Sequence, residues 1–233
     1  MALPAEGCVA DGPFDTSAII VFLSIPGRSL QRGTMRHALP LLAVAPLLAG
    51  CAATLKAPAP QDAFFAALSA HCGKAYAGRL ASDQEADADM RGKAMIVHFR
   101  TCTPDRLEIP FHIEGLAKDG GWDRSRTWVI TRTDAGLRLK HDHRHADGSK
   151  DEVTMYGGDT AANGNAMRQE FPVDAESIAM FTRTGRSASN TNIWAIETTS
   201  TGYTYELYRA GRLFRVAFDY DRPVAPPPAP WGW

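Results

Sequence analysis

Sequence patterns that mark the common enzyme classes are missing from this chain of 233 residues. No GxSxG, HExxH, GxGxxG or P-loop pattern occurs, so serine hydrolases, zinc peptidases and nucleotide-binding folds are not indicated. Neither charge is in excess: 25 Lys and Arg residues stand against 26 Asp and Glu residues, and the formal net charge is −1. Because a nucleic-acid-binding surface normally carries a basic patch, we expect no nucleic-acid partner. Because the enzyme motifs are missing, an enzyme is not the favoured interpretation.

Long apolar runs are scarce as well. A helix needs roughly 20 apolar residues to span a bilayer, and the run Ser17–Ile25 is much shorter. We therefore expect no membrane-spanning helix. With 45% hydrophobic and 22% charged residues, the composition is that of an ordinary globular protein.

The clearest positive signal lies near the N-terminus. From Met35 the chain has a short basic start and an apolar stretch, followed by Leu48-Ala49-Gly50-Cys51. A basic start, a short apolar region and small residues before a cleavage point are the parts of a secretory signal. The stretch resembles a bacterial lipoprotein signal peptide with its lipobox, which implies cleavage before Cys51 and a lipid on its thiol. Ala52 then implies sorting to the outer membrane, with the protein facing the periplasm.

This resemblance divides the chain into segments. It also implies that the protein contacts the membrane through its lipid anchor. The pattern gives no indication of an oligomeric state. The expected segments are residues 1–34, a spurious upstream extension; 35–50, the signal peptide; 51–61, an Ala/Pro-rich tether; 62–222, one folded domain; and 223–233, a Pro-rich tail.

Cysteine is rare, and Cys72 and Cys102 are the two that follow Cys51. An even pair in an exported protein favours a disulfide, which for a loop of this length stabilises a fold by about 3 kcal/mol. Two reduced, buried cysteines are the alternative. Because the pair is widely separated and no CxxC occurs, thioredoxin-like chemistry and zinc fingers are not indicated.

Most of the domain has the pattern of short β-strands. The segments are rich in Val, Ile, Thr and aromatic residues and are separated by Gly, Asp, Asn or Pro. Two helices are also predicted, one over residues 62–73 with Asp62 as its N-cap and one over Ala175–Phe181 capped by Asp174. The predicted strands are Tyr76–Ser82, Ala94–Thr101, Leu107–Glu114, Arg126–Thr133, Leu137–His145, Glu152–Tyr156, Ala166–Val173, Asn192–Thr199, Tyr203–Arg209 and Leu213–Tyr220.

Ten short strands joined by hairpins, with one leading helix, predict an all-β fold. We favour an antiparallel meander barrel, and a β-sandwich is the alternative. The leading helix, the strand opening at Gly73–Leu80 and the meander that follows are similar to the calycin (lipocalin-like) layout, an analogy at the level of the fold.

Three histidines stand at alternate positions of the predicted strand Leu137–His145. Alternate residues of a strand share one face. We expect the charged face to lie in water and the histidines to continue the leucine face toward the core or the mouth of the barrel. One face carries Leu137, Leu139, His141, His143 and His145, and the other carries Arg138, Lys140, Asp142 and Arg144.

The favoured interpretation of this strand is a ligand pocket. A two-residue turn at Asp134-Ala135 pairs the strand with the one before it, whereas a three-residue turn shifts the register by one. Trp, Arg and His side chains on one wall suit a small anionic or amphipathic ligand whose carboxylate meets the arginines. The two-residue turn places Trp128 opposite His141, Arg126 opposite His143 and Arg124 opposite His145.

Two alternatives remain open. A metal-binding protein or metal-dependent enzyme would hold zinc or copper through His141, His143 and His112. His145 cannot complete such a set, because alternate residues lie about 6.6 Å apart along a strand and the outer pair is too far apart. The favoured interpretation involves no cofactor. The other alternative is a structural envelope protein without a ligand, whose histidines and arginines form an ion-paired network at a barrel rim.

The stretch 123–160, DRSRTWVITRTDAGLRLKHDHRHADGSKDEVTMYGGDT, resembles a family of small secreted proteobacterial proteins without an assigned activity. The similarity extends over most of Asp62–Trp231. It implies a domain that folds as a unit, and it implies no particular function.

Overall fold

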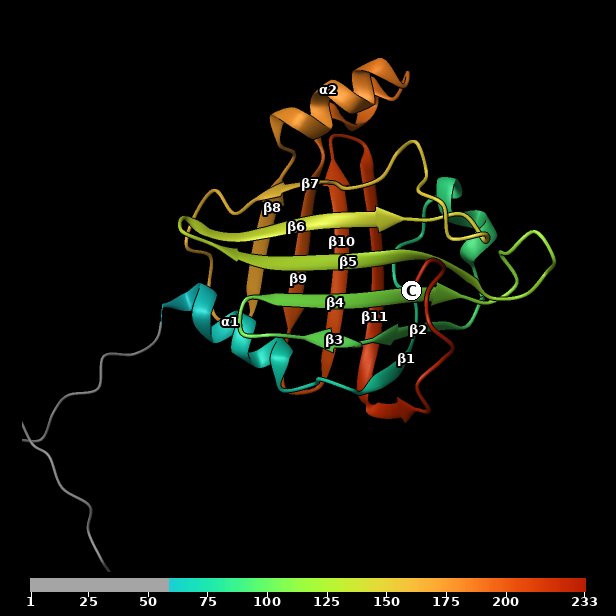
Figure 1. The fold of residues 1–233 in the computed structure, drawn as a ribbon, viewed down its shortest axis with the longest axis horizontal. Coiled ribbons are helices and arrows are strands. Elements are labelled where there is room, and N and C mark those ends of the chain that lie inside the picture. The colour runs from blue at the N-terminus through green and yellow to red at the C-terminus, as the bar shows by residue number, and fades with distance from the viewer. Residues whose placement is uncertain (1–58) are drawn as a thin grey trace, which may run out of the picture. The chain divides into compact units, whose positions relative to one another are not determined.

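Residues 59–233, the part of the chain that the computed structural model describes, form one antiparallel sheet that curls into an almost closed barrel (Figure 1). The prediction of an all-β barrel is confirmed. The signal-like segment, the lipid-bearing Cys51 and the proposed start at Met35 lie outside the described residues. The strands are β1 Ala75–Leu80, β2 Met95–His98, β3 Thr101–Cys102, β4 Arg106–Ile113, β5 Asp123–Thr133, β6 Gly136–His143, β7 Tyr156–Asp159, β8 Arg168–Pro172, β9 Ile193–Thr198, β10 Gly202–Arg209 and β11 Arg212–Val224; the helices are α1 Pro60–Ser69 and α2 Ala175–Arg183, with 3₁₀ turns η1 Glu85–Met90 and η2 Ser187–Thr191.

The strand order is β7-β6-β5-β4-β2-β1-β11-β10-β9-β8, with β3 paired to β4. The two ends of this order approach each other where Asp174 N donates to Gly157 O at 2.9 Å. A Cβ on Gly157 would lie 1.8 Å from Leu139 O, and one on Gly158 would lie 1.7 Å from Pro172 O. Gly158 thus allows the close approach to Pro172 of β8 across this seam, and Gly157 allows the close approach to Leu139 of the neighbouring strand β6.

The seam corrects one sequence-based expectation. The strand predicted over Glu152–Tyr156 is wrong except at its last residue, because β7 is Tyr156–Asp159 and contains Gly157 and Gly158. Glycine is depleted in strands in general, so the pattern pointed to the preceding residues instead.

The first helix starts earlier than predicted. Asp62 is not its N-cap: Pro60 occupies the first turn, Ala59 holds the N-cap position, and no side chain caps the helix. Asp62 lies within the first turn, where its carboxylate suits the helix dipole, and it pairs with Arg132 of β5. Phe64, Phe65 and Leu68 point into the core, as predicted.

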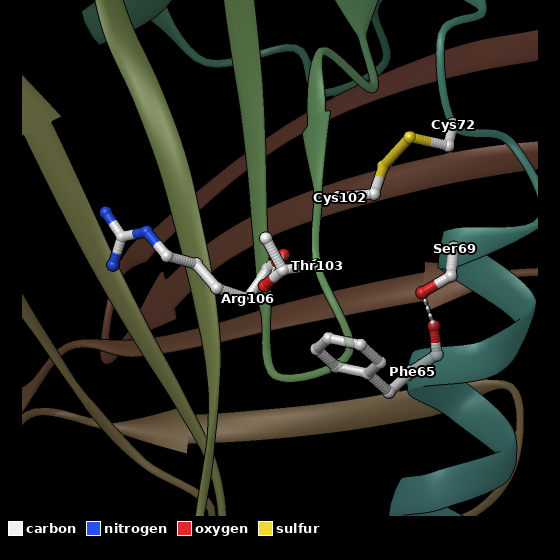
Figure 2. Close-up of a disulfide and its surroundings, with 6 residues drawn as sticks. All are labelled: Phe65, Ser69, Cys72, Cys102, Thr103 and Arg106. Carbon is white, nitrogen blue, oxygen red and sulfur yellow. Dashed lines mark hydrogen bonds between the residues drawn. A yellow bond between two sulfur atoms is a disulfide. The ribbon is translucent and has the colours of Figure 1, made fainter.

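The disulfide between Cys72 and Cys102 is formed, which confirms the predicted pairing (Figure 2). It joins the segment after α1 to the short strand β3. Close by, Ser69 Oγ donates to Phe65 O at 2.8 Å in the last turn of the helix. The disulfide thereby links the segment that follows the leading helix to the β3–β4 hairpin.

The second helix covers part of the sheet and corrects another expectation. Its predicted N-cap is confirmed, because Asp174 accepts a hydrogen bond from Ser177 N at 2.8 Å. Lys140 of β6 reaches this helix and pairs with Asp174 and Glu176, and it is only 9% exposed. Asp142 is 4% exposed and pairs with Arg144. The expectation that the charged face of β6 lies in water therefore holds for Arg138, which is exposed, and is wrong for Lys140 and Asp142, which a later helix and a hairpin cover.

The chain after β11, Ala225–Trp233, crosses the outer face of the sheet in front of β4 and β5 (Figure 1). We call it the strap. Arg124 Nη1 donates to Ala229 O at 2.8 Å, and Trp231 N donates to Arg124 O at 3.0 Å. The Arg100 guanidinium lies 5.7 Å from the centre of the Trp233 ring. Within residues 59–233, none of the helices has the length and apolar character needed to span a membrane.

Candidate functional site

The β5–β6 hairpin has the register of the two-residue turn. Thr133 pairs with Gly136, Trp128 with His141, and Arg126 with His143. Beyond that point Arg144 pairs with Lys150 and His145 is exposed, so the expected pair of Arg124 and His145 does not continue the ladder.

A cavity of about 160 Å³ lies at the end of the barrel that η1 borders. We call it the inner cavity. Four of the five residues proposed from the sequence line it, and the fifth, Arg124, lines a separate hollow on the outside of the sheet. The inner cavity is lined by Asp87, Met90, Phe111, Arg126, Trp128, His141, His143, Tyr156, Tyr205, Leu207, Arg212 and Phe214.

His141 is held at both ring nitrogens. Nδ1 lies 3.0 Å from Tyr156 O and Nε2 lies 2.7 Å from the Tyr205 hydroxyl. A carbonyl oxygen only accepts, so Nδ1 carries the proton and Nε2 accepts from Tyr205. Burial lowers the pKa of His141 to about 3, so the ring is neutral at pH 7.

His143 and Tyr156 form a second pair, with the hydroxyl 3.0 Å from Nε2. Burial, and then the nearby Arg126 guanidinium, lower the pKa of His143 to about 4. Burial raises the pKa of Tyr156 to about 12. Both side chains are therefore uncharged at pH 7, and Tyr156 keeps the proton it can donate.

Stacked aromatic rings form the floor of the inner cavity. Trp128 stacks on Phe111 with ring centres 5.0 Å apart, and on Tyr205 with ring centres 4.3 Å apart. All three side chains are buried. The barrel interior beneath the cavity is thus filled with side chains, and the cavity is confined to one end.

Two guanidinium groups face the inner cavity, each compensated by a buried carboxylate. Arg126 pairs with Asp123, and Arg212 of β11 pairs with Asp87 of η1. Burial acts to raise the pKa of Asp123, but Arg126 and Ser125 outweigh it and the pKa lies below its ordinary value. Asp87 is 2% exposed, although it lies in a stretch rich in acidic residues, which are usually solvated.

Several lining residues had no signal in the sequence. Arg212 follows a predicted hairpin turn, and Tyr156 was placed at the end of a strand that does not form. Tyr205 and Phe214 were expected within strands, but the alternation of a strand does not tell which neighbours it meets across a barrel. The residues that face β5 and β6 across the inner cavity could be identified only once the strand order was known.

The proposed metal ligands do not come together. His112 of β4 lies on the outer face of the sheet, while His141 and His143 line the inner cavity. Among residues 59–233 no group of three or more His, Cys, Asp or Glu side chains is arranged to hold a metal ion. The metal alternative gains no support from this geometry.

The second hollow, which we call the outer groove, has a volume of about 1110 Å³. It lies between the outer face of β4 and β5, the segment 115–122, the hairpin after β6 and the strap. Its lining includes His112, Trp122, Arg124, Pro227, Pro228 and Trp231.

Comparison of the chain with protein families, with curated proteins and with solved structures gave no match.

Proposed function

We propose that this protein binds a small carboxylate with a short apolar chain in the inner cavity. The observation that carries the proposal is the convergence of Arg126, His143, Tyr156 and Trp128 on one cavity at an end of the barrel. Ligand sites are typically apolar hollows with a few convergent polar groups, and this cavity has that composition.

The polar wall favours an acid over a base. Arg126 uses Nη1 for Asp123, and its Nε and Nη2 make no hydrogen bond within residues 59–233. The Tyr156 hydroxyl lies 3.0 Å from His143 Nε2, and in the tautomer in which this hydroxyl donates, Nδ1 of His143 carries the ring proton and is available as a donor. A carboxylate can accept from a guanidinium and an imidazole N–H together, and hydrogen bonds to charged groups are the stronger ones. A cation would meet Arg126 unfavourably.

The opposite wall accommodates the apolar part. Met90, Leu207 and Phe214 line the cavity from η1, β10 and β11. A volume of about 160 Å³ is below the roughly 300–1,000 Å³ of pockets for drug-sized molecules. The ligand is therefore a short acid, or the head of a longer one whose chain leaves the cavity.

The cellular compartment in which binding would occur is supported by the sequence alone. A lipid on Cys51 would attach the domain to the outer membrane, facing the periplasm. The formed disulfide fits an oxidising compartment of that kind.

Calorimetric titration of the full-length protein at pH 7 with acetate, butanoate, hexanoate and octanoate tests the proposal. Affinity should rise with chain length until the cavity is filled and then level off, because each buried methylene contributes about 0.8 kcal/mol. Butylamine and hexylamine, which reverse the charge, should not bind. No binding by any acid at millimolar concentration would refute the proposal.

Two substitutions assign the binding to the cavity. Leu207→Trp should block it and reduce affinity at least about tenfold, equivalent to about 1.4 kcal/mol. Tyr208→Trp, the next residue on the same strand and on the opposite face, is the matched control and should bind as the parent does. Arg126→Lys keeps the charge beside Asp123 but loses the planar fork, so it should weaken binding severalfold. Equal affinity in all three variants would place the ligand elsewhere.

A further inference from the structure

The outer groove contains an imidazole without a hydrogen-bond partner. His112 is 1% exposed, and neither Nδ1 nor Nε2 contacts a donor or acceptor within residues 59–233. A neutral imidazole always has one N–H donor and one acceptor, and a buried group left unsatisfied typically costs about 1–3 kcal/mol. An apolar side chain would be the more stable choice here, so the histidine requires another explanation.

A β-bulge brings His112 beside Arg124. The β4–β5 register shifts between Phe111, which pairs with Arg126, and Ile113, which pairs with Asp123. His112 therefore lies opposite Arg124 and Ser125. The Arg124 guanidinium contributes to lowering the pKa of His112 to about 4, after the larger effect of burial.

Arg124 itself has unused donors. Its Nη1 donates to Ala229 O of the strap, whereas Nε and Nη2 make no hydrogen bond within the described part of the chain, and no carboxylate pairs with it there. An unpaired guanidinium beside an unpaired imidazole N–H is a suitable arrangement for one carboxylate group.

The walls of the outer groove suit a flat ring. Trp122 comes from the segment before β5, and Trp231, Pro227 and Pro228 come from the strap. Aromatic rings stack favourably in offset or edge-to-face arrangements. The volume of about 1110 Å³ is at the upper end of the range for small-molecule sites, so a ring and its substituent fit.

The remaining charges limit the ligand to a single negative charge. Asp119, Asp147, Asp151 and Lys118 also line the groove, and within residues 59–233 none of them forms an ion pair, so these four side chains together carry a net charge of −2. They would repel a dianion or a phosphate, although one carboxylate directed at Arg124 remains favourable. We propose that the outer groove is a second binding site, for an aromatic monocarboxylate whose acid group meets Arg124 and His112 and whose ring packs on Trp122 and Trp231.

Binding requires a small movement of the groove wall. Both ring nitrogens of His112 are covered in this structure, so a ligand reaches them only when part of the groove wall, of which the strap is one side, shifts. The strap makes two hydrogen bonds to Arg124 and one cation–π contact through Trp233. Pro230 is also buried, and Gly232 lies close against Gly148, so the movement required is a local shift of the strap and not its release.

Calorimetric titration of the full-length protein with benzoate, phenylacetate and indole-3-acetate tests this site. Cyclohexanecarboxylate, which lacks a flat ring, and phthalate, which carries two charges, should bind roughly tenfold more weakly or not at all. His112→Leu, Arg124→Lys and Trp231→Ala should each weaken binding of the aromatic acids roughly tenfold. His98→Leu, which removes a second buried histidine that does not line the groove, is the matched control for His112→Leu and should leave the affinity unchanged.

The inner-cavity variant Leu207→Trp separates the two sites. It should abolish binding of straight-chain acids and leave that of the aromatic acids intact. Absence of binding by all three aromatic acids at millimolar concentration overturns the proposal, as does unchanged affinity in both Arg124→Lys and Trp231→Ala. Arg124→Lys keeps this decision clear if His112→Leu alters the fold, because Arg124 is only partly buried.

Discussion

The inner cavity and the outer groove both contain buried, neutral histidines, and they differ in how those histidines are held. His141 in the inner cavity has a partner at each nitrogen, whereas His112 in the outer groove has none within the described residues. Burial is nearly equal, at 3% and 1% exposure. The same residue type at the same depth is therefore part of the architecture in one place and an unexplained cost in the other.

This difference shows where a functional role has to be sought. A satisfied buried network rigidifies its surroundings and can exist for stability alone. An unsatisfied one lowers stability and requires an explanation. Trp194 and Tyr203 each have one such atom in the core, away from both hollows, whereas His112 has both ring nitrogens unsatisfied and lines the outer groove. By this criterion the outer groove has the stronger indication of a ligand contact, and the inner cavity has the better organised walls.

The largest expected effect is common to both regions and concerns pH. The folded protein binds a proton on His112, His141 and His143 only near pH 3–4, but the unfolded chain does so near pH 6.5. The unfolded state therefore binds more protons as the pH falls below 6.5, and the free energy of unfolding decreases. Between pH 7 and pH 5 we expect a loss of roughly 1–2 kcal/mol for each histidine, about 3–6 kcal/mol in total.

Urea unfolding at pH 5, 6 and 7 measures this loss. The carboxylates with lowered pKa, Asp123 and Asp174 among them, lose their contribution only below their ordinary pKa near 4, so they stay outside this window. Burial also lowers the pKa values of His71 and His98, which add to the slope, so His112→Leu and His141→Leu should each remove less than a third of it. A slope that His112→Leu leaves unchanged would mean that this ring is not buried in its neutral form.

The next effect separates the two regions directly. At pH 7, His141→Leu leaves the Tyr205 hydroxyl and the Tyr156 carbonyl without their partner, and it should lower the free energy of unfolding by roughly 2–4 kcal/mol. His112→Leu removes no hydrogen bond formed within residues 59–233, and it should change stability by less than about 1 kcal/mol or raise it. Urea unfolding of both variants decides the matter. Similar losses in the two would show that a buried water satisfies His112.

The sequence predicted the parts of this architecture that depend on local periodicity and pairing. Alternation placed Leu137, Leu139 and His141 inside, and the Asp134-Ala135 turn defined the register that pairs Trp128 with His141. The disulfide followed from the number of cysteines and the expected export. In each case the information is contained in a short segment or in a count.

Features that depend on distant segments could not be predicted. Lys140 and Asp142 alternate as a solvent-facing strand should, yet α2 and the hairpin after β6 cover them. Arg124 was expected beside the other pocket residues, but a bulge and the strap place it in the outer groove. Gly157 and Gly158 have turn chemistry, and only their close contacts with Leu139 of β6 and Pro172 of β8 explain them as strand residues.

The smallest expected effects test the same rule with tyrosine hydroxyls. Tyr156→Phe removes the hydrogen bond to His143, whose half-buried ring water can partly reach, and it should lower the free energy of unfolding by about 0.5–1.5 kcal/mol. The Tyr203 hydroxyl is fully buried and has no partner within the described residues. Tyr203→Phe is therefore the matched substitution and should be neutral or slightly stabilising, since it removes an unsatisfied group. Urea unfolding of both variants measures the difference. A larger loss of unfolding free energy for Tyr203→Phe than for Tyr156→Phe would mean that water satisfies the Tyr203 hydroxyl. A missing protein partner would then no longer distinguish His112 in the outer groove from a satisfied side chain.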